Sequence, residues 1–154
     1  MKRSLLFGVV LAFVVVAMAF AQGKPNFSGK WTPEQAAAAA EQGRGRGMGG
    51  GPMTVTQTDK TLTIERTMGE TTMKTVYNLD GTETKNEVSR GGQTMTQMLS
   101  AKWDGSKLLL TTKSEGPSGP MERTQTWSLS AEGKLQVEQP GQGGNVRTTI
   151  YTKG

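Results

Sequence analysis

Most of the chain after residue 52 consists of short runs in which apolar and polar residues alternate, the two-residue period of β-strands. Alternation is clearest over residues 71–88, where Asp80-Gly81 separates two such runs. Asp-Gly favours a two-residue turn because both residues tolerate positive φ. We therefore expect a hairpin over residues 71–88 in which Tyr77 faces Thr84.

Three further hairpins follow from the same pattern. A second Asp-Gly, at Asp104-Gly105, separates the runs 94–103 and 106–114 and would set Lys102 opposite Lys107. A three-residue loop at 131–133 ends in Gly and aligns Trp127 with Val137. Weaker turn residues at 59–60 separate 55–57 from 62–64, and residues 146–150 form a closing strand.

These segments amount to nine strands from Met53 onward, and an earlier alternating stretch at 26–31 adds one more. Consecutive strands joined by short turns, each with one apolar face, indicate an all-β, antiparallel up-and-down meander. Closing it into a barrel of about 8–10 strands would protect its edges. Residues 53–154 would then complete a single barrel together with 26–31.

The first 21 residues have the pattern of a cleavable secretory signal. Lys2 and Arg3 precede an apolar run that ends at Phe20, and Ala19 and Ala21 form a signal peptidase site. An uncleaved anchor is the alternative, but the run is short for a full span. We therefore expect an exported protein, periplasmic or secreted, with no stable membrane span after cleavage.

Residues 22–52 combine the first strand, an Ala-rich helix and a Gly-rich linker. Thr32 is a good N-cap, Pro33 suits the first helical position, and Ala36–Ala40 have high helix propensity. The helix would end at Gly43. It has no large apolar stripe, so we expect it to form a lid or a surface plug. For the linker at 43–52, we favour a flexible connector over a phosphate or RNA site.

Charge and residue types exclude several functions. Removing Lys2 and Arg3 from the 18 basic side chains leaves 16 against 13 acidic ones, a net charge of +3 that is too small and scattered to indicate nucleic acid. The chain has no His and no Cys. It therefore lacks the side chains that most often act as general base, thiol nucleophile and zinc ligand, and we predict no cofactor, no metal and no enzymatic activity.

The segment Phe27-Ser28-Gly29-Lys30-Trp31, followed by a helical segment and a long meander, resembles the lipocalin and fatty-acid-binding protein group. That group carries a G-x-W signature on its first strand, and the resemblance implies that Trp31 closes the base of the barrel. Fatty-acid binders also hold a ligand carboxylate with an Arg-x-Tyr pair on the last strand. This chain has Arg147 and Tyr151 instead, four residues apart, so that site is not transferred.

The predicted pairing places aromatic, apolar and polar side chains on one inward face. An apolar ligand would contact a wall, and a polar group would be oriented by an arginine and two glutamines. The wall consists of Met73, Tyr77, Leu99, Trp103 and Trp127, and the polar set of Gln97, Arg123 and Gln125. For Arg123 we favour the rim of the barrel over its interior, because Pro120 is near.

The methionines could bind copper(I), but we favour core filling because only Met95 and Met98 are close, on opposite faces of one strand.

Taken together, these sequence features favour a non-enzymatic carrier or sensor of a small apolar or amphiphilic ligand. A structural or envelope-interaction module with a filled core is the alternative. A Tyr/Arg-based isomerase or cyclase is the third class.

Overall fold

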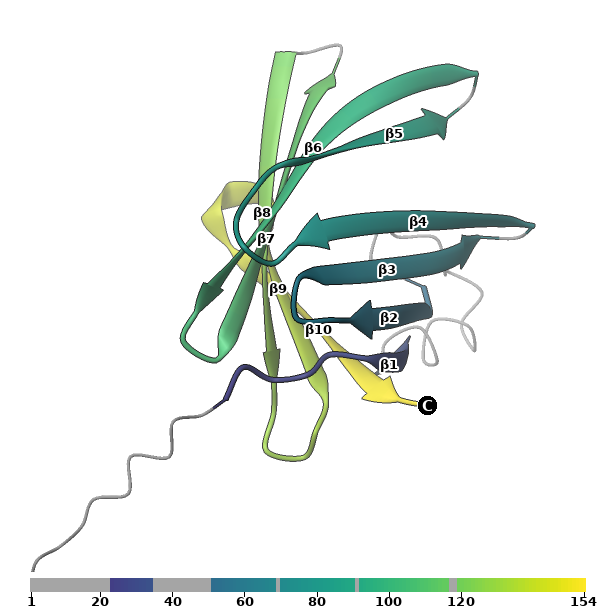
Figure 1. Cartoon of the computed structure of the whole chain (residues 1–154). Helices are drawn as coiled ribbons and strands as arrows, with labels where there is room; N and C mark the ends of the chain where they lie inside the picture. Colours follow the sequence, from purple (N-terminus) through teal and green to yellow (C-terminus); the bar gives the residue numbers. More distant parts are fainter. Residues whose placement is uncertain (1–22, 35–50, 69, 91, 117–118) are drawn as a thin grey trace, which may run out of the picture.

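The computed structural model describes residues 23–34, 51–68, 70–90, 92–116 and 119–154 (Figure 1). Within these ranges the chain forms ten β-strands and one short 3₁₀ turn at Gln142–Gly144. The strands are β1 Gly29–Pro33, β2 Met53–Gln57, β3 Thr61–Met68, β4 Thr71–Asn78, β5 Thr84–Arg90, β6 Gln93–Asp104, β7 Lys107–Gly116, β8 Gly119–Leu129, β9 Leu135–Pro140 and β10 Val146–Lys153.

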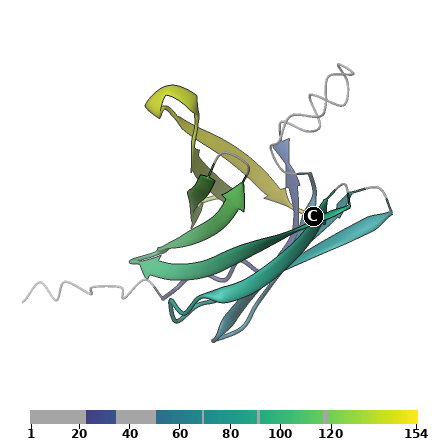
Figure 2. The same cartoon turned by 90° about the horizontal axis from the view of Figure 1, so that it is seen from above.

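All ten strands belong to one antiparallel sheet in the order β4-β3-β2-β1-β10-β9-β8-β7-β6-β5. The sheet curls into a nearly closed barrel, as the two views show (Figures 1 and 2). This confirms the all-β meander and the count of nine strands from Met53 plus one before it. The first strand lies between β2 and β10 and so joins the two ends of the chain.

The predicted hairpin over residues 71–88 is wrong. β4 pairs with β3 and β5 pairs with β6, so β4 and β5 are the two edges of the sheet. The Asp80 carboxylate accepts hydrogen bonds from the Thr82 backbone N–H (2.9 Å) and hydroxyl (2.6 Å). This side-chain turn reverses the chain without the backbone ladder that a two-residue hairpin requires.

The turn at Asp104-Gly105 forms with a different register. Asp104 pairs with Lys107, and Lys102 therefore faces Leu109 rather than Lys107. Gly105 is the first central residue, with φ of 60°, as a type II′ turn requires. The shift is two residues, so every side chain keeps its predicted face. The loop at 131–133 is confirmed, because Trp127 pairs with Val137.

β1 extends to Pro33 instead of ending at Trp31. Thr32 and Pro33 pair with Thr152 and Tyr151, so neither caps nor begins a helix as predicted. Pairing with β10 has overridden the local capping signal at these two residues. The predicted signal peptide at 1–21, the Ala-rich helix beyond residue 34 and most of the linker lie outside the described residues. Within the described ranges, no helix has the length and apolarity to cross a membrane.

Aromatic side chains fill one end of the barrel, here called the base. The Phe27 ring stacks on Trp103 with centroids 6.1 Å apart and meets Trp127 edge-on at 5.8 Å. The Trp31 Nε1–H donates to the Phe27 carbonyl at 2.8 Å. Phe27 and Trp127 have no exposed surface and Trp31 has 1%. Trp31 therefore has the structural position that the G-x-W resemblance implied.

Gly29 of the G-x-W sequence has φ of 145°, a conformation that only glycine adopts readily. A Cβ at this position would lie 2.5 Å from Cε of Lys153, whose ammonium group lies 5.8 Å from the centroid of the Trp31 ring. The positive φ is the main reason for glycine here, because the contacting atoms belong to the flexible end of the Lys153 side chain and can move.

Base packing predicts a large stability loss for Trp127→Ala. Removing a fully buried Trp should lower the free energy of unfolding by about 3–5 kcal/mol. Val146→Ala, at a side chain that is 68% exposed, should change it by less than about 0.5 kcal/mol. Urea denaturation followed by circular dichroism measures both. Equal midpoints for the two variants would contradict the assignment of Trp127 to the core.

Candidate functional site

Strand alternation divides the barrel into an inner face, which includes the base, and an outer face. Leu62 and Ile64 are buried on β3, so Arg66, two residues further on, lies on the inner face. By the same alternation Arg123 on β8 and Arg147 on β10 are inner residues. The carboxylates on the described strands all alternate outward, namely Glu65, Glu87, Asp104, Glu115, Glu122 and Glu138.

The salt bridges of the described residues all use lysine. They join Lys74 to Glu65 (3.8 Å), Lys85 to Glu87 (2.9 Å), Lys113 to Glu83 (2.7 Å) and Lys134 to Glu34 (2.6 Å). These exposed pairs contribute little stability. They show that charges are neutralised on the outside, whereas no carboxylate of the described strands lies on the face of the inner arginines. The inner face therefore has a local excess of positive charge.

Arg66 is the most enclosed of these arginines. One terminal nitrogen, Nη2, lies 3.6 Å from the thioether sulfur of Met53. Its Nε is buried and has no hydrogen-bond partner among the described residues. A guanidinium carries five N–H donors, and a buried unsatisfied donor costs about 1–3 kcal/mol. Arg66 was not predicted from the sequence, because the predicted strand ended at Ile64 although the alternation continues.

Two tyrosines line the inner face near Arg66. The Tyr77 hydroxyl lies 3.2 Å from that of Thr112 on β7, a contact that spans the barrel from an edge strand. Burial raises the pKa of Tyr77, while the Thr112 hydrogen bond and the positive charge of Arg66 partly offset the rise. Burial likewise raises the pKa of Tyr151, partly offset by Arg66 and Arg147. Arg66 is therefore within electrostatic reach of both phenols.

Thr84 adds a second unsatisfied group. It lies on β5 and pairs with Leu99, which on its other side pairs with Thr112. Its hydroxyl oxygen is buried without a hydrogen-bond partner in the described structure. The middle of the inner face thus holds an arginine, two phenols and two threonine hydroxyls, of which two groups have unused hydrogen-bonding capacity.

All eight ligand contacts predicted from the sequence lie on the inner face, at different depths. The buried ones are Tyr77, Leu99 and Trp127; the half-buried ones are Gln97, Trp103 and Gln125; and the exposed ones are Met73 and Arg123. Trp103 and Trp127 belong to the base. Gln125 donates to the Gln139 side chain (3.3 Å) and accepts from Trp127 Nε1 (3.4 Å). Contact of these eight predicted residues with a ligand stays a prediction.

A cleft of about 800 Å³ opens where two hairpins separate. The β6–β7 ladder ends at the pair Gln97 and Ser114, yet β6 begins four residues earlier and β7 continues to Gly116. Beyond this pair, β5–β6 forms the first arm and β7–β8 the second arm, and the arms diverge (Figure 1). We call the space between them the arm cleft.

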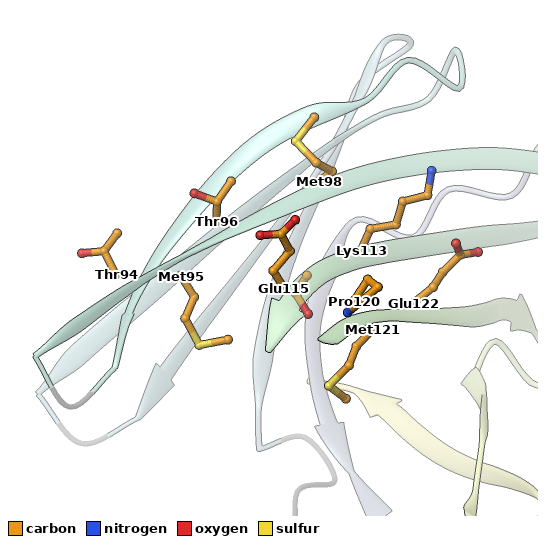
Figure 3. Close-up of a pocket in the computed structure, with 10 residues that line it drawn as sticks. Thr94, Met95, Thr96, Met98, Lys113, Glu115, Pro120, Met121 and Glu122 are labelled. Carbon is orange, nitrogen blue, oxygen red and sulfur yellow. The ribbon is translucent and has the colours of Figure 1, made fainter. Parts of the chain in front are cut away.

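Both arms contribute side chains to the arm cleft (Figure 3). The first arm supplies Thr94, Met95, Thr96 and Met98, and the second supplies Lys113, Ser114, Glu115, Pro120, Met121 and Glu122. In Figure 3, Met95 and Met98 point to opposite sides of β6, as alternation predicts. The described residues contain no group of three or more acidic, His or Cys side chains that could hold a metal ion.

Comparisons with known proteins identify the fold. A protein described as the REP1-NXSQ fatty acid transporter is 17% identical over 82% of this chain and 95% of that one, with a TM-score of 0.55. The fluorescent protein UnaG is 19% identical over 83% and 96%, also with a TM-score of 0.55. Secretory abundant heat soluble protein 4 from Ramazzottius varieornatus is 18% identical over 82% and 94%, with a TM-score of 0.51.

No protein-family model matches the chain, and no curated protein matches it. The solved structures therefore establish the fold alone. They show that this chain has the β-barrel fold of these proteins, which confirms the structural resemblance drawn from Gly29-Lys30-Trp31 and the meander.

The raised pKa values of the two tyrosines can be measured directly because the chain contains only these two. Titrating the phenolate absorbance of the folded protein should give a midpoint above 10, and unfolding in urea should return it to about 10. In Tyr77→Phe the remaining signal from Tyr151 should still titrate above 10. A folded-state midpoint at or below 10 would contradict the burial of the phenols.

The sign of the associated stability change follows from linkage. Below pH 10 both states keep the phenolic protons, so this contribution is constant. Above it the unfolded chain ionises first, and the free energy of unfolding falls until the folded phenols also ionise.

Proposed function

We propose that this chain is a non-enzymatic binding protein for a small amphiphilic anion. The observation that carries the proposal is the charge of the inner face. Arg66, Arg123 and Arg147 lie there without a carboxylate from the described strands, and the Nε of Arg66 is buried with no hydrogen-bond partner among the residues the structure describes. An anionic group bound beside Arg66 would accept the unused hydrogen bonds and reduce the repulsion among the arginines.

The phenols suit the same ligand. With raised pKa values they are neutral at physiological pH, so each can donate a hydrogen bond to an anion. Thr84 offers a further hydroxyl. The apolar and thioether side chains of the inner face, such as Met53, would contact the rest of the ligand.

The structural neighbours support a ligand-binding role, since one of them is described as a fatty acid transporter. The absence of His and Cys from the sequence argues against the commonest catalytic sets. A small amphiphilic anion therefore satisfies the charge, the hydrogen-bonding groups and the fold together.

Arg66→Gln should weaken binding of dodecanoate by about 10- to 100-fold, because a charge-assisted hydrogen bond is worth about 1.5–3 kcal/mol. Arg123→Ala, at an exposed position, should weaken it by only about threefold. Isothermal titration calorimetry on the full mature protein gives both dissociation constants. Dodecanol, which has the same chain without the charge, should bind the wild type and Arg66→Gln equally.

Lys102→Gln is the matched control for this experiment. It also removes one positive charge, but from an exposed outer position on β6, so its dissociation constant should equal that of the wild type. An equal loss in Lys102→Gln and Arg66→Gln would assign the effect to net charge alone. Failure of the wild type to bind either probe would favour the structural or envelope-interaction module.

We also propose that the protein is exported, on the signal-peptide pattern of its first 21 residues. Expression of the full chain in a bacterial host should yield a periplasmic product whose mass corresponds to a chain starting at Gln22. Intact-protein mass spectrometry of the periplasmic fraction measures this. A product that keeps Met1 to Ala21 in the membrane fraction would favour the uncleaved anchor.

A further inference from the structure

The arm cleft is lined by residues from both faces of the barrel wall. Three of them, Met95, Ser114 and Met121, alternate inward, and the other seven alternate outward. Ser114 pairs with both Gln97 and Met121, and the next inner pair on the second arm is Thr112 with Arg123. A molecule that contacts Ser114 and Met121 would therefore lie next to the inner pair that contains Arg123.

The base leaves no comparable space. Its buried side chains, among them Phe27, Leu108, Trp127 and Leu135, have no exposed surface. An apolar chain attached to an anion near Arg66 cannot extend toward the base without displacing this packing, which would be costly. Away from the base, the inner face leads to the arm cleft, whose volume of about 800 Å³ is within the usual range for small-molecule sites.

The lining of the arm cleft combines four apolar side chains with six polar ones, among them the carboxylates of Glu115 and Glu122. Three of the apolar side chains are methionines, which adapt to an unbranched apolar chain because thioethers are flexible and polarisable. Met121 is 54% exposed, a high exposure for a large apolar side chain. Among the described residues that line the cleft, Lys113 is the one cation, and its ion pair with Glu83 raises its pKa. The described lining therefore offers no unpaired cation to an anionic group.

We propose that the arm cleft holds the apolar chain of the ligand whose anionic group the inner arginines bind. This inference rests on the proposed function and adds the ligand's orientation: the charged end lies inside the barrel, and the chain lies between the arms against Met95 and Met121. The arm cleft then determines selectivity for the length of the apolar chain, whereas the arginines determine selectivity for the charged group.

An engineered disulfide can close the cleft. Continuing the β6–β7 ladder by one step beyond Gln97 and Ser114 would pair Thr96 with Glu115. Oxidising the double variant Thr96→Cys/Glu115→Cys should draw the arms together, because a disulfide requires Cα atoms about 5.5 Å apart. The natural chain has no Cys, so no other disulfide can form.

Closure should weaken dodecanoate binding at least tenfold, weaken octanoate binding less, and be reversed by dithiothreitol. The matched control is Ser100→Cys/Thr111→Cys, an outer-face pair four residues along the same ladder, which is already joined and should leave both affinities unchanged. Calorimetry gives the affinities and stopped-flow fluorescence displacement gives the rates. Unchanged affinity, or slower rates with unchanged affinity, would overturn the proposal.

A second variant covers failure of the disulfide to form. Met121→Gln keeps the side-chain length at an exposed position and should weaken dodecanoate binding about threefold or more. Val146→Gln, at the other strongly exposed apolar side chain, should have no effect. If Arg66→Gln weakens binding while both cleft variants leave it unchanged, only the cleft proposal fails. If the wild type binds no dodecanoate, the proposed function fails with it.

Discussion

Aromatic packing at the base is the interaction on which the barrel depends. Its two edge strands, β4 and β5, share no ladder, so hydrogen bonding alone cannot close the sheet. Phe27, from the segment before β1, contacts Trp103 on β6 and Trp127 on β8. It thereby ties the N-terminal segment to strands on the far side of the barrel. The contact between Tyr77 and Thr112 adds one polar link across the interior.

With the base filled, the structure can leave polar groups unsatisfied higher in the barrel. Alternation directs the strand carboxylates outward, where lysines neutralise some of them, and directs the described arginines inward. Arg66 Nε and the Thr84 hydroxyl have no hydrogen-bond partner within the described part of the chain, and a buried polar group left unsatisfied costs about 1–3 kcal/mol. Apolar residues at these two positions would avoid that cost. The cost is consistent with selection for binding rather than for stability.

Strand positions and faces could be predicted from the sequence, whereas some pairings could not. Alternation within a strand is local, so Tyr77 and Trp127 were placed on the correct face. Pairing depends on partners distant in the sequence. Asp80-Gly81 carries a hairpin signal, but the Asp80 carboxylate instead bonds to Thr82, and β4 and β5 each have another neighbour. Local turn chemistry cannot identify the open seam of a barrel.

The candidate site was predictable to the same extent. The eight predicted contacts share the inner face, but Arg66 was missed because residues 65 and 66, both charged, obscured the continuing alternation. The arm cleft depends on where the β6–β7 ladder stops, and a pattern that continues through both strands gives no sign of that point. A barrel whose wall separates into two arms can accommodate chains longer than its interior. Its specificity for chain length would then depend on the separation of the arms rather than on the volume enclosed by the sheet.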